Sequence, residues 1–143
     1  MPEELRPIMR VLAFDFGLAR IGVASGQTIT NTASPVTILS AHDGTPNWTE
    51  VTTLITTWGP DAIIIGKPLH MDGSKSDMQV YAEAFAAECQ SRYNLKIFLV
   101  DERLSSEEVS YRLKSMDNHQ RRKNAPIDDL AACVILETWL SKQ

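Results

Sequence analysis

The sequence predicts an α/β fold, with a five-stranded mixed sheet (three antiparallel strands, then two parallel strands) flanked by helices. Two observations predict it. Residues 9–38 form short β-favouring runs joined by short connections, whereas the later part of the chain alternates continuous apolar runs with stretches of helical period. With 143 residues, 43% of them hydrophobic, the chain has the size of one domain with a substantial core. We therefore expect a single domain over 1–143, with 1–8 as a frayed lead-in.

The antiparallel part of the sheet comes first along the chain. MRVLAFD (9–15) and RIGVAS (20–25) favour β structure, and the short FGLA between them predicts a hairpin. A third, weaker strand over 32–38 contains Pro35, which predicts a position at the edge of the sheet.

The later part of the chain predicts helices around two buried strands. DAIIIG (61–66) and KIFLVD (96–101) are continuous apolar runs, typical of strands that are covered on both faces. The expected helices cover 46–58, 76–92, 106–115 and 127–141. This order of elements matches the ribonuclease-H-like architecture, in which functional groups collect outside the carboxyl ends of the central strands.

Carboxylates follow the apolar runs at three places. Asp15 ends the first strand, Asp101 and Glu102 end the last one, and Asp128 lies at the start of the final helix. A carboxylate beside apolar surroundings is costly unless it is paired, hydrogen-bonded or bound to a metal ion. We predict that these carboxylates meet and bind Mg²⁺ or Mn²⁺. Two such ions about 4 Å apart would suit hydrolysis of a phosphodiester bond.

Each carboxylate also has a more ordinary interpretation. Asp15 could bond backbone amides of its own turn, and Asp101 or Glu102 could pair with Arg103. Asp128 could simply stabilise the start of a helix. Because neighbouring residues point in different directions, only one of Asp101 and Glu102 is expected to face the site. The joint placement of the three clusters favours the metal site.

Charge distribution bears on the substrate. The formal net charge is −4, which disfavours a non-specific nucleic-acid binder. Cations nevertheless flank the predicted site, and we expect them to contact a nucleic-acid backbone. They are Arg20, Lys67, Lys75, Arg103, Arg121, Arg122 and Lys123. The alternative is that these charges belong to ordinary solvated loops.

Other features indicate a cytoplasmic protein. Cys89 and Cys133 follow neither disulfide nor zinc spacing, which suits a reducing compartment and a role in core packing. No signal peptide and no apolar run of membrane-spanning length is evident, so no membrane contact is expected. The three histidines show no metal-ligand spacing and are expected at the surface.

Four segments resemble the signature segments of the YqgF/RuvX family, in matching order from about residue 10 to residue 139. They are FDFGLARIGVA, IIIGKPLHMDGS, VDERLSS and IDDLAACVILE. Members are ribonuclease-H-like proteins described as pre-16S ribosomal RNA nucleases and as Holliday-junction resolvases. The resemblance implies that Asp15 is the first-strand aspartate, Glu102 the acid of the second motif and Asp128 the late aspartate.

The leading functional expectation is a metal-dependent endonuclease that processes the 5′ end of pre-16S ribosomal RNA. A resolvase of four-way DNA junctions is the alternative, and its two symmetric cuts would require a two-fold dimer. Monomer and homodimer therefore both stay open. A nucleotide-binding module and a non-catalytic ribosome-associated scaffold are the remaining alternatives.

Overall fold

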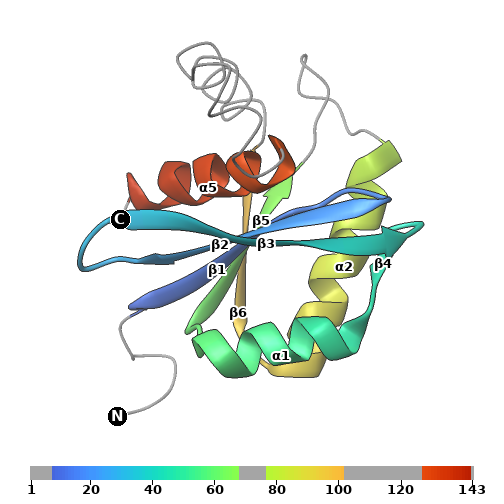
Figure 1. Cartoon of the computed structure of the whole chain (residues 1–143), viewed down its shortest axis with the longest axis horizontal. Helices are drawn as coiled ribbons and strands as arrows, with labels where there is room; N and C mark the ends of the chain where they lie inside the picture. The colour runs from blue at the N-terminus through green and yellow to red at the C-terminus, as the bar shows by residue number, and fades with distance from the viewer. Residues whose placement is uncertain (1–7, 68–76, 102–126, 143) are drawn as a thin grey trace.

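The computed structural model describes residues 8–67, 77–101 and 127–142, in which a twisted sheet lies between helices (Figure 1). The strands are β1 (Arg10–Asp15), β2 (Arg20–Gln27), β3 (Thr32–His42), β4 (Thr45–Pro46), β5 (Ala62–Lys67) and β6 (Lys96–Asp101). The helices are α1 (Trp48–Trp58), α2 (Asp77–Tyr93) and α5 (Ile127–Leu140). The helix expected over 106–115 and the lead-in over 1–7 lie outside the described residues.

The sheet has the order β4-β3-β2-β1-β5-β6. β1, β2 and β3 are antiparallel neighbours, whereas β5 pairs in parallel with both β1 and β6. This confirms the mixed α/β sheet of three antiparallel strands followed by two parallel ones. The number of strands is six rather than five, so the predicted count is wrong by one.

The additional strand is β4, which is too short to leave a pattern in the sequence. Asp43 and Gly44 both have positive φ, at 49° and 82°, and form the two-residue turn of a hairpin. β3 therefore continues to His42, beyond the expected end at residue 38. After two residues of β4, Asn47 caps α1 by accepting a hydrogen bond from the Thr49 amide at 2.9 Å. The helix thus begins at Trp48, two residues later than expected.

Each face of the sheet has its own hydrophobic core. Alternation along β1 directs Leu12 and Phe14 toward α1 and α2, and directs Val11 and Ala13 toward α5. All four are buried, which explains why this strand reads as a continuous apolar run. Of the described helices, α5 covers the second face, and its residues 132–136 are all buried.

Two further sequence expectations are confirmed within the described part. Cys89 and Cys133 are buried free thiols, so their role is packing. The His42 side chain is 96% exposed, as expected of a surface histidine, whereas His70 and His119 lie outside the described residues. None of the helices in the described part is long and apolar enough to cross a membrane.

Candidate active site

The parallel strands β1, β5 and β6 all end at one edge of the sheet, which we call the carboxyl edge. Their last residues are Asp15, Lys67 and Asp101. Lys67 is in register with Asp101, and Phe14 is in register with Ile65. Since β5 separates β1 from β6, the backbones at Asp15 and Asp101 lie on strands about 10 Å apart. The fold thus brings two of the predicted acidic positions to one edge.

The turn that follows Asp15 is tightly packed. Phe16 is buried and its ring lies 5.4 Å from that of Phe85, which anchors the start of the turn in the core. A Cβ atom added at Gly17 would lie 2.5 Å from the backbone oxygen of Arg20. Only glycine leaves room for that oxygen, so the close approach lies within the turn itself.

The β3–β4 hairpin holds the same turn from outside. The carbonyl of Leu18 accepts a hydrogen bond from the Gly44 amide at 2.9 Å, and that of Ala19 accepts one from the Ala41 amide at 2.8 Å. Two backbone hydrogen bonds and a buried ring therefore fix the chain directly after Asp15. The position of this carboxylate is set before any ligand binds, which is what a catalytic site requires.

Asp15 is half-buried and belongs to the α5 face of the sheet. Val11 and Ala13 pack toward α5, and the period of two along β1 places Asp15 on the same side. Arg20 is exposed at the first position of β2, and because this strand runs antiparallel to β1 it begins at the carboxyl edge. A half-buried carboxylate with an arginine at the same edge suits a site for a cation and a phosphate.

The start of α5 reaches the same edge. A Cβ atom on Gly26 would lie 2.7 Å from the Leu136 side chain, so Leu136 packs on β2 at Gly26. Gly26 is in register with Val11 of β1, so Leu136 also marks the level of Val11. Asp128 precedes Leu136 by eight residues, about 12 Å of helix, and Asp15 follows Val11 by four, about 13 Å of strand. Figure 1 shows that α5 ends on the side of the sheet where β1 begins. The backbones of Asp15 and Asp128 therefore both lie toward the carboxyl edge.

The predicted site residues are only partly covered by the described structure. The side chains of Lys67, Asp101 and Asp128 are not described, and Glu102 lies outside the described residues. Lys75, Arg103, Arg121, Arg122 and Lys123 also lie outside them. Within the described part, no group of three or more metal-ligating side chains occurs. The donor chemistry of Asp15 nevertheless fits a hard divalent ion, which prefers carboxylate oxygens.

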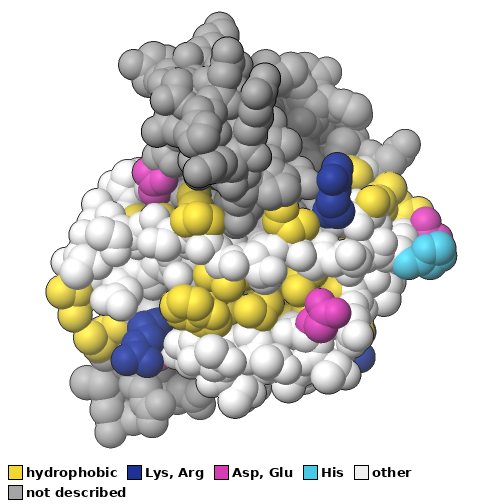
Figure 2. All heavy atoms as spheres, in the orientation of Figure 1, with side chains coloured by type: hydrophobic (Ala, Val, Ile, Leu, Met, Phe, Trp, Pro, Cys, Tyr) yellow, Lys and Arg dark blue, Asp and Glu magenta, His cyan; other side chains and the backbone are white. Residues whose placement is uncertain are grey.

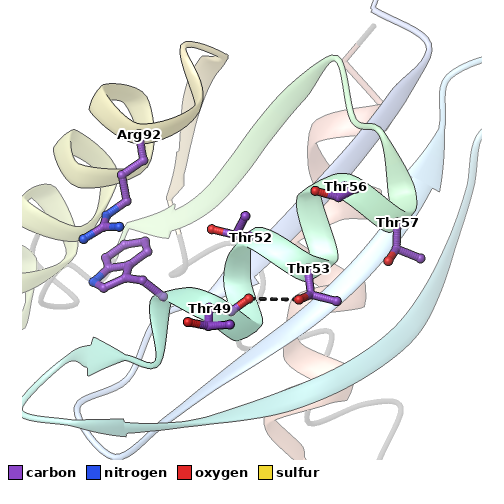
Figure 3. Close-up of a pocket in the computed structure, with 7 residues that line it drawn as sticks. Thr49, Thr52, Thr53, Thr56, Thr57 and Arg92 are labelled. Carbon is purple, nitrogen blue, oxygen red and sulfur yellow. Dashed lines mark hydrogen bonds between the residues drawn. The ribbon is translucent and has the colours of Figure 1, made fainter.

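A groove on the outer side of α1 is a separate feature with a volume of about 410 Å³ (Figure 3). Threonines repeat along it at helical spacing, at positions 49, 52, 53, 56 and 57. Arg92 closes one end, with its guanidinium 4.5 Å from the Trp48 ring centroid and its Nε 2.8 Å from Glu88. Because this arginine already has an anionic and an aromatic partner, the groove offers no unengaged cation to a phosphate.

Two side chains of α2, Cys89 and Tyr93, have raised pKa values. Burial raises the pKa of the Cys89 thiol to about 12, with the Glu88 charge as a smaller contribution in the same direction and Arg92 opposing it. Burial also raises the pKa of Tyr93, which a hydrogen bond from or to Thr52 partly offsets. A thiol that stays protonated is neither a nucleophile nor a metal ligand.

These elements define a class of fold. The sheet of antiparallel and parallel strands with helices on both faces is the fold of solved Holliday junction resolvases. The fowlpox virus Holliday junction resolvase superposes with a TM-score of 0.54 at 18% identity, covering 94% of this chain and 100% of that one. Thermus thermophilus RuvC, in complex with a Holliday junction substrate, gives 0.55 at 12% identity, covering 89% and 91%.

Sequence comparison identifies the family within this class. Residues 9–142 match the RuvX family model, described as "Holliday junction resolvase". The chain belongs to the RuvX family, which confirms the resemblance seen in its four segments. A relative from Francisella tularensis subsp. novicida, named "Putative pre-16S rRNA nuclease", is 45% identical over 132 residues, which are 92% of this chain and 96% of the relative. A relative of the same name from Francisella tularensis subsp. tularensis is 44% identical over the same shares.

Proposed function

We propose that this protein is a divalent-metal-dependent endonuclease that processes the 5′ end of pre-16S ribosomal RNA. Identity of 45% with a relative named "Putative pre-16S rRNA nuclease", over nearly the whole length of both chains, is the observation that carries the proposal. The carboxyl edge supplies the physical basis, because a carboxylate in a firmly held turn shares this edge with an exposed arginine.

Asp15, Glu102 and Asp128 are the proposed catalytic and metal-binding residues. The alternation of β6 supports Glu102 over Asp101. Phe98 and Val100 contribute to the core beneath α5, so even-numbered positions face the side on which Asp15 lies. A strand that keeps this alternation for one more residue would direct Glu102, and not Asp101, to the site. Asp101 then remains an additional candidate ligand.

The chain's own residues have three tasks in this proposal. Asp15, Glu102 and Asp128 hold the cations, and the partial burial of Asp15 raises the cost of leaving its charge uncompensated. Arg20 contacts the substrate backbone from the exposed start of β2. A bound divalent ion supplies Lewis-acid polarisation of the phosphoryl group and lowers the pKa of its water. The held turn at Asp15 keeps the donor oriented, so little reorganisation is needed when substrate arrives.

A resolvase of four-way DNA junctions is the second candidate. The family description and the RuvC complex favour it, since both name Holliday junctions. The same carboxylates would act on a different substrate. Two symmetric cuts require two sites related by a two-fold axis, so this function predicts a stable homodimer. For either substrate we propose a cytoplasmic location, where ribosomal RNA and the chromosome are both accessible.

The test is cleavage of a labelled pre-16S RNA fragment and of a four-way DNA junction, with Mg²⁺, with Mn²⁺ or with EDTA. Asp15→Asn, Glu102→Gln and Asp128→Asn should each abolish metal-dependent cutting while the protein stays folded. Asp101→Asn should reduce cutting less than Glu102→Gln does.

Asp43→Asn is the matched control, because it removes the same charge from an exposed position in the β3–β4 turn. Asparagine also tolerates the positive φ found there. Full activity in Asp15→Asn, or cutting in EDTA, would remove the proposed mechanism.

A further inference from the structure

A hollow of about 420 Å³ lies at the amino edge of the sheet, opposite the carboxyl edge. It forms where α1 ends and the sheet continues. On the α1 side, Leu12 and Val23 are buried beneath the helices. On the same face of the sheet, the residues that lie closer to the amino edge than Leu12 and Val23 are polar.

The strand register assembles this polar surface from three strands. Arg10 pairs with Gln27, and Gln27 pairs with Thr32, which gives one row across β1, β2 and β3. The neighbouring row contains the pair Ser25 and Ser34. Residues paired across strands lie on the same face, so both rows face one hollow. We call this surface the polar shelf.

Trp58 forms the wall of the polar shelf. It is the last residue of α1, and Gly59 follows in the left-handed conformation that ends the helix. The Trp58 side chain is 40% exposed, although its helix has a buried face available for apolar groups. An indole left open beside hydroxyl and amide side chains provides a flat surface for stacking a planar ring.

Arg10 supplies the charge of the polar shelf. It is exposed and makes no ion pair with any other described residue. Its backbone is fixed, because Asp61 Oδ2 accepts from the Arg10 amide at 2.9 Å and the Arg10 carbonyl accepts from the Asp61 amide at 2.8 Å. Arg92 differs in this respect, since its guanidinium is already held by Glu88 and Trp48.

We propose that the polar shelf binds a nucleotide unit. The base stacks on Trp58, the phosphate pairs with Arg10, and the serine and glutamine side chains bond the sugar or the base edge. An aromatic ring with a nearby cation and hydroxyl groups is the combination by which proteins hold single nucleotides of a strand. In Figure 2, the Lys and Arg side chains on the face in view are scattered singly rather than gathered in one patch.

The nucleotide unit has two sources, a free nucleotide or a nucleotide within the substrate strand. The second rests on the proposed nuclease function. Arg10 and Asp15 are five residues apart on β1, about 17 Å. Because the polar shelf faces α1 and Asp15 faces α5, the path between them is longer than this. A stacked strand rises about 3.4 Å per nucleotide, so about five stacked nucleotides cover the straight distance alone.

The first experiment titrates 5′-AMP into the ¹⁵N-labelled full chain in EDTA and follows the Trp58 indole N–H and the amides of Ser25 and Gln27 by NMR. We expect saturable shifts at these signals in the unmodified chain. The shifts of the Ser25 and Gln27 amides should be lost in Trp58→Ala and retained in Trp58→Tyr, which keeps a stacking surface. The second adds a single-stranded 12-mer. Displacement of AMP by the 12-mer assigns the polar shelf to strand binding, whereas AMP binding without displacement assigns it to a free nucleotide.

Arg10→Gln should weaken the binding of whichever ligand occupies the polar shelf by at least about fivefold. Arg92→Gln, with the same charge change in the α1 groove, should leave it unchanged. Absence of shifts with both AMP and the 12-mer would overturn the proposal. Binding is measured in EDTA, so it does not depend on metal-dependent cleavage. A protein that cleaves but shows no shifts would refute only the polar-shelf proposal. A protein that shows shifts but does not cleave would refute only the proposed nuclease function.

Discussion

Replacing Gly17 by alanine tests whether the turn after Asp15 positions the active site. The new Cβ would lie 2.5 Å from the Arg20 backbone oxygen, whereas real Cβ contacts essentially never fall below 3.0 Å and ordinary contact begins at 3.4 Å. The two segments must therefore move apart by roughly 0.5–0.9 Å, because neither atom belongs to a flexible side chain. Overpacking of this kind costs about 1–3 kcal/mol. For a chain of this length, that lowers the melting temperature by about 4–10 °C.

The effect on catalysis should be larger than the effect on stability. A displacement approaching 1 Å in a positioning element costs about 100-fold in rate. We therefore expect kcat for the RNA substrate to fall by about 10–100-fold in Gly17→Ala at temperatures where the protein is fully folded. Thermal unfolding by circular dichroism and single-turnover cleavage measure the two quantities separately.

Val51→Ala provides the comparison. Val51 is fully buried in α1, away from the carboxyl edge, and its truncation costs about 2 kcal/mol. It should lose similar stability and keep its kcat. If Gly17→Ala melts and cuts like the unmodified chain, the reasoning about this turn is refuted. If it is destabilised but cuts as well as Val51→Ala, the turn does not position the site.

Three other predictions follow from the packing. Asn47→Ala removes the cap of α1 and should cost about 1 kcal/mol in chemical denaturation, whereas Asn47→Asp should retain most of the stability. Leu136→Ala should cost about 2–5 kcal/mol, since this side chain is fully buried against the sheet. The raised pKa of Cys89 means that the folded state keeps its proton between pH 9 and about 12 while the unfolded thiol loses it. Stability should therefore decrease over that range, Cys89→Ala should remove this component, and a thiol reagent at pH 8 should label Cys89 only after unfolding.

The order of elements could be predicted because each central strand is buried on both faces. β1 and β5 therefore appear as continuous apolar runs, and β1 ends at Asp15. The expectation that 96–101 is also covered on both faces is wrong, because β6 lies at the edge of the described sheet and Leu99 is 44% exposed. β4 could not be predicted, because two residues carry no period. The sequence does contain the Asp-Gly pair typical of a two-residue hairpin, at Asp43 and Gly44. A prediction that used this pair would also have placed the end of β3 at His42.

The sites divide in the same way. Asp15 could be proposed as a site residue from the sequence because it ends an apolar strand, and the family resemblance points to the same residue. The polar shelf could not, since Arg10, Gln27 and Thr32 are ordinary surface residues until the strand register aligns them in one row. The preference for Glu102 over Asp101 in our proposal likewise depends on the face that Phe98 and Val100 occupy.

The hairpin at Asp43 and Gly44 has a consequence for engineering this protein. Surface turns are the usual places to insert tags or open new termini. Here the Gly44 amide donates a hydrogen bond to the Leu18 carbonyl in the turn that follows Asp15. The Phe16 ring also leaves no space for a Cβ at Gly44. A peptide inserted between residues 43 and 44 should therefore displace the turn after Asp15 and lower activity, although most of the domain would stay folded.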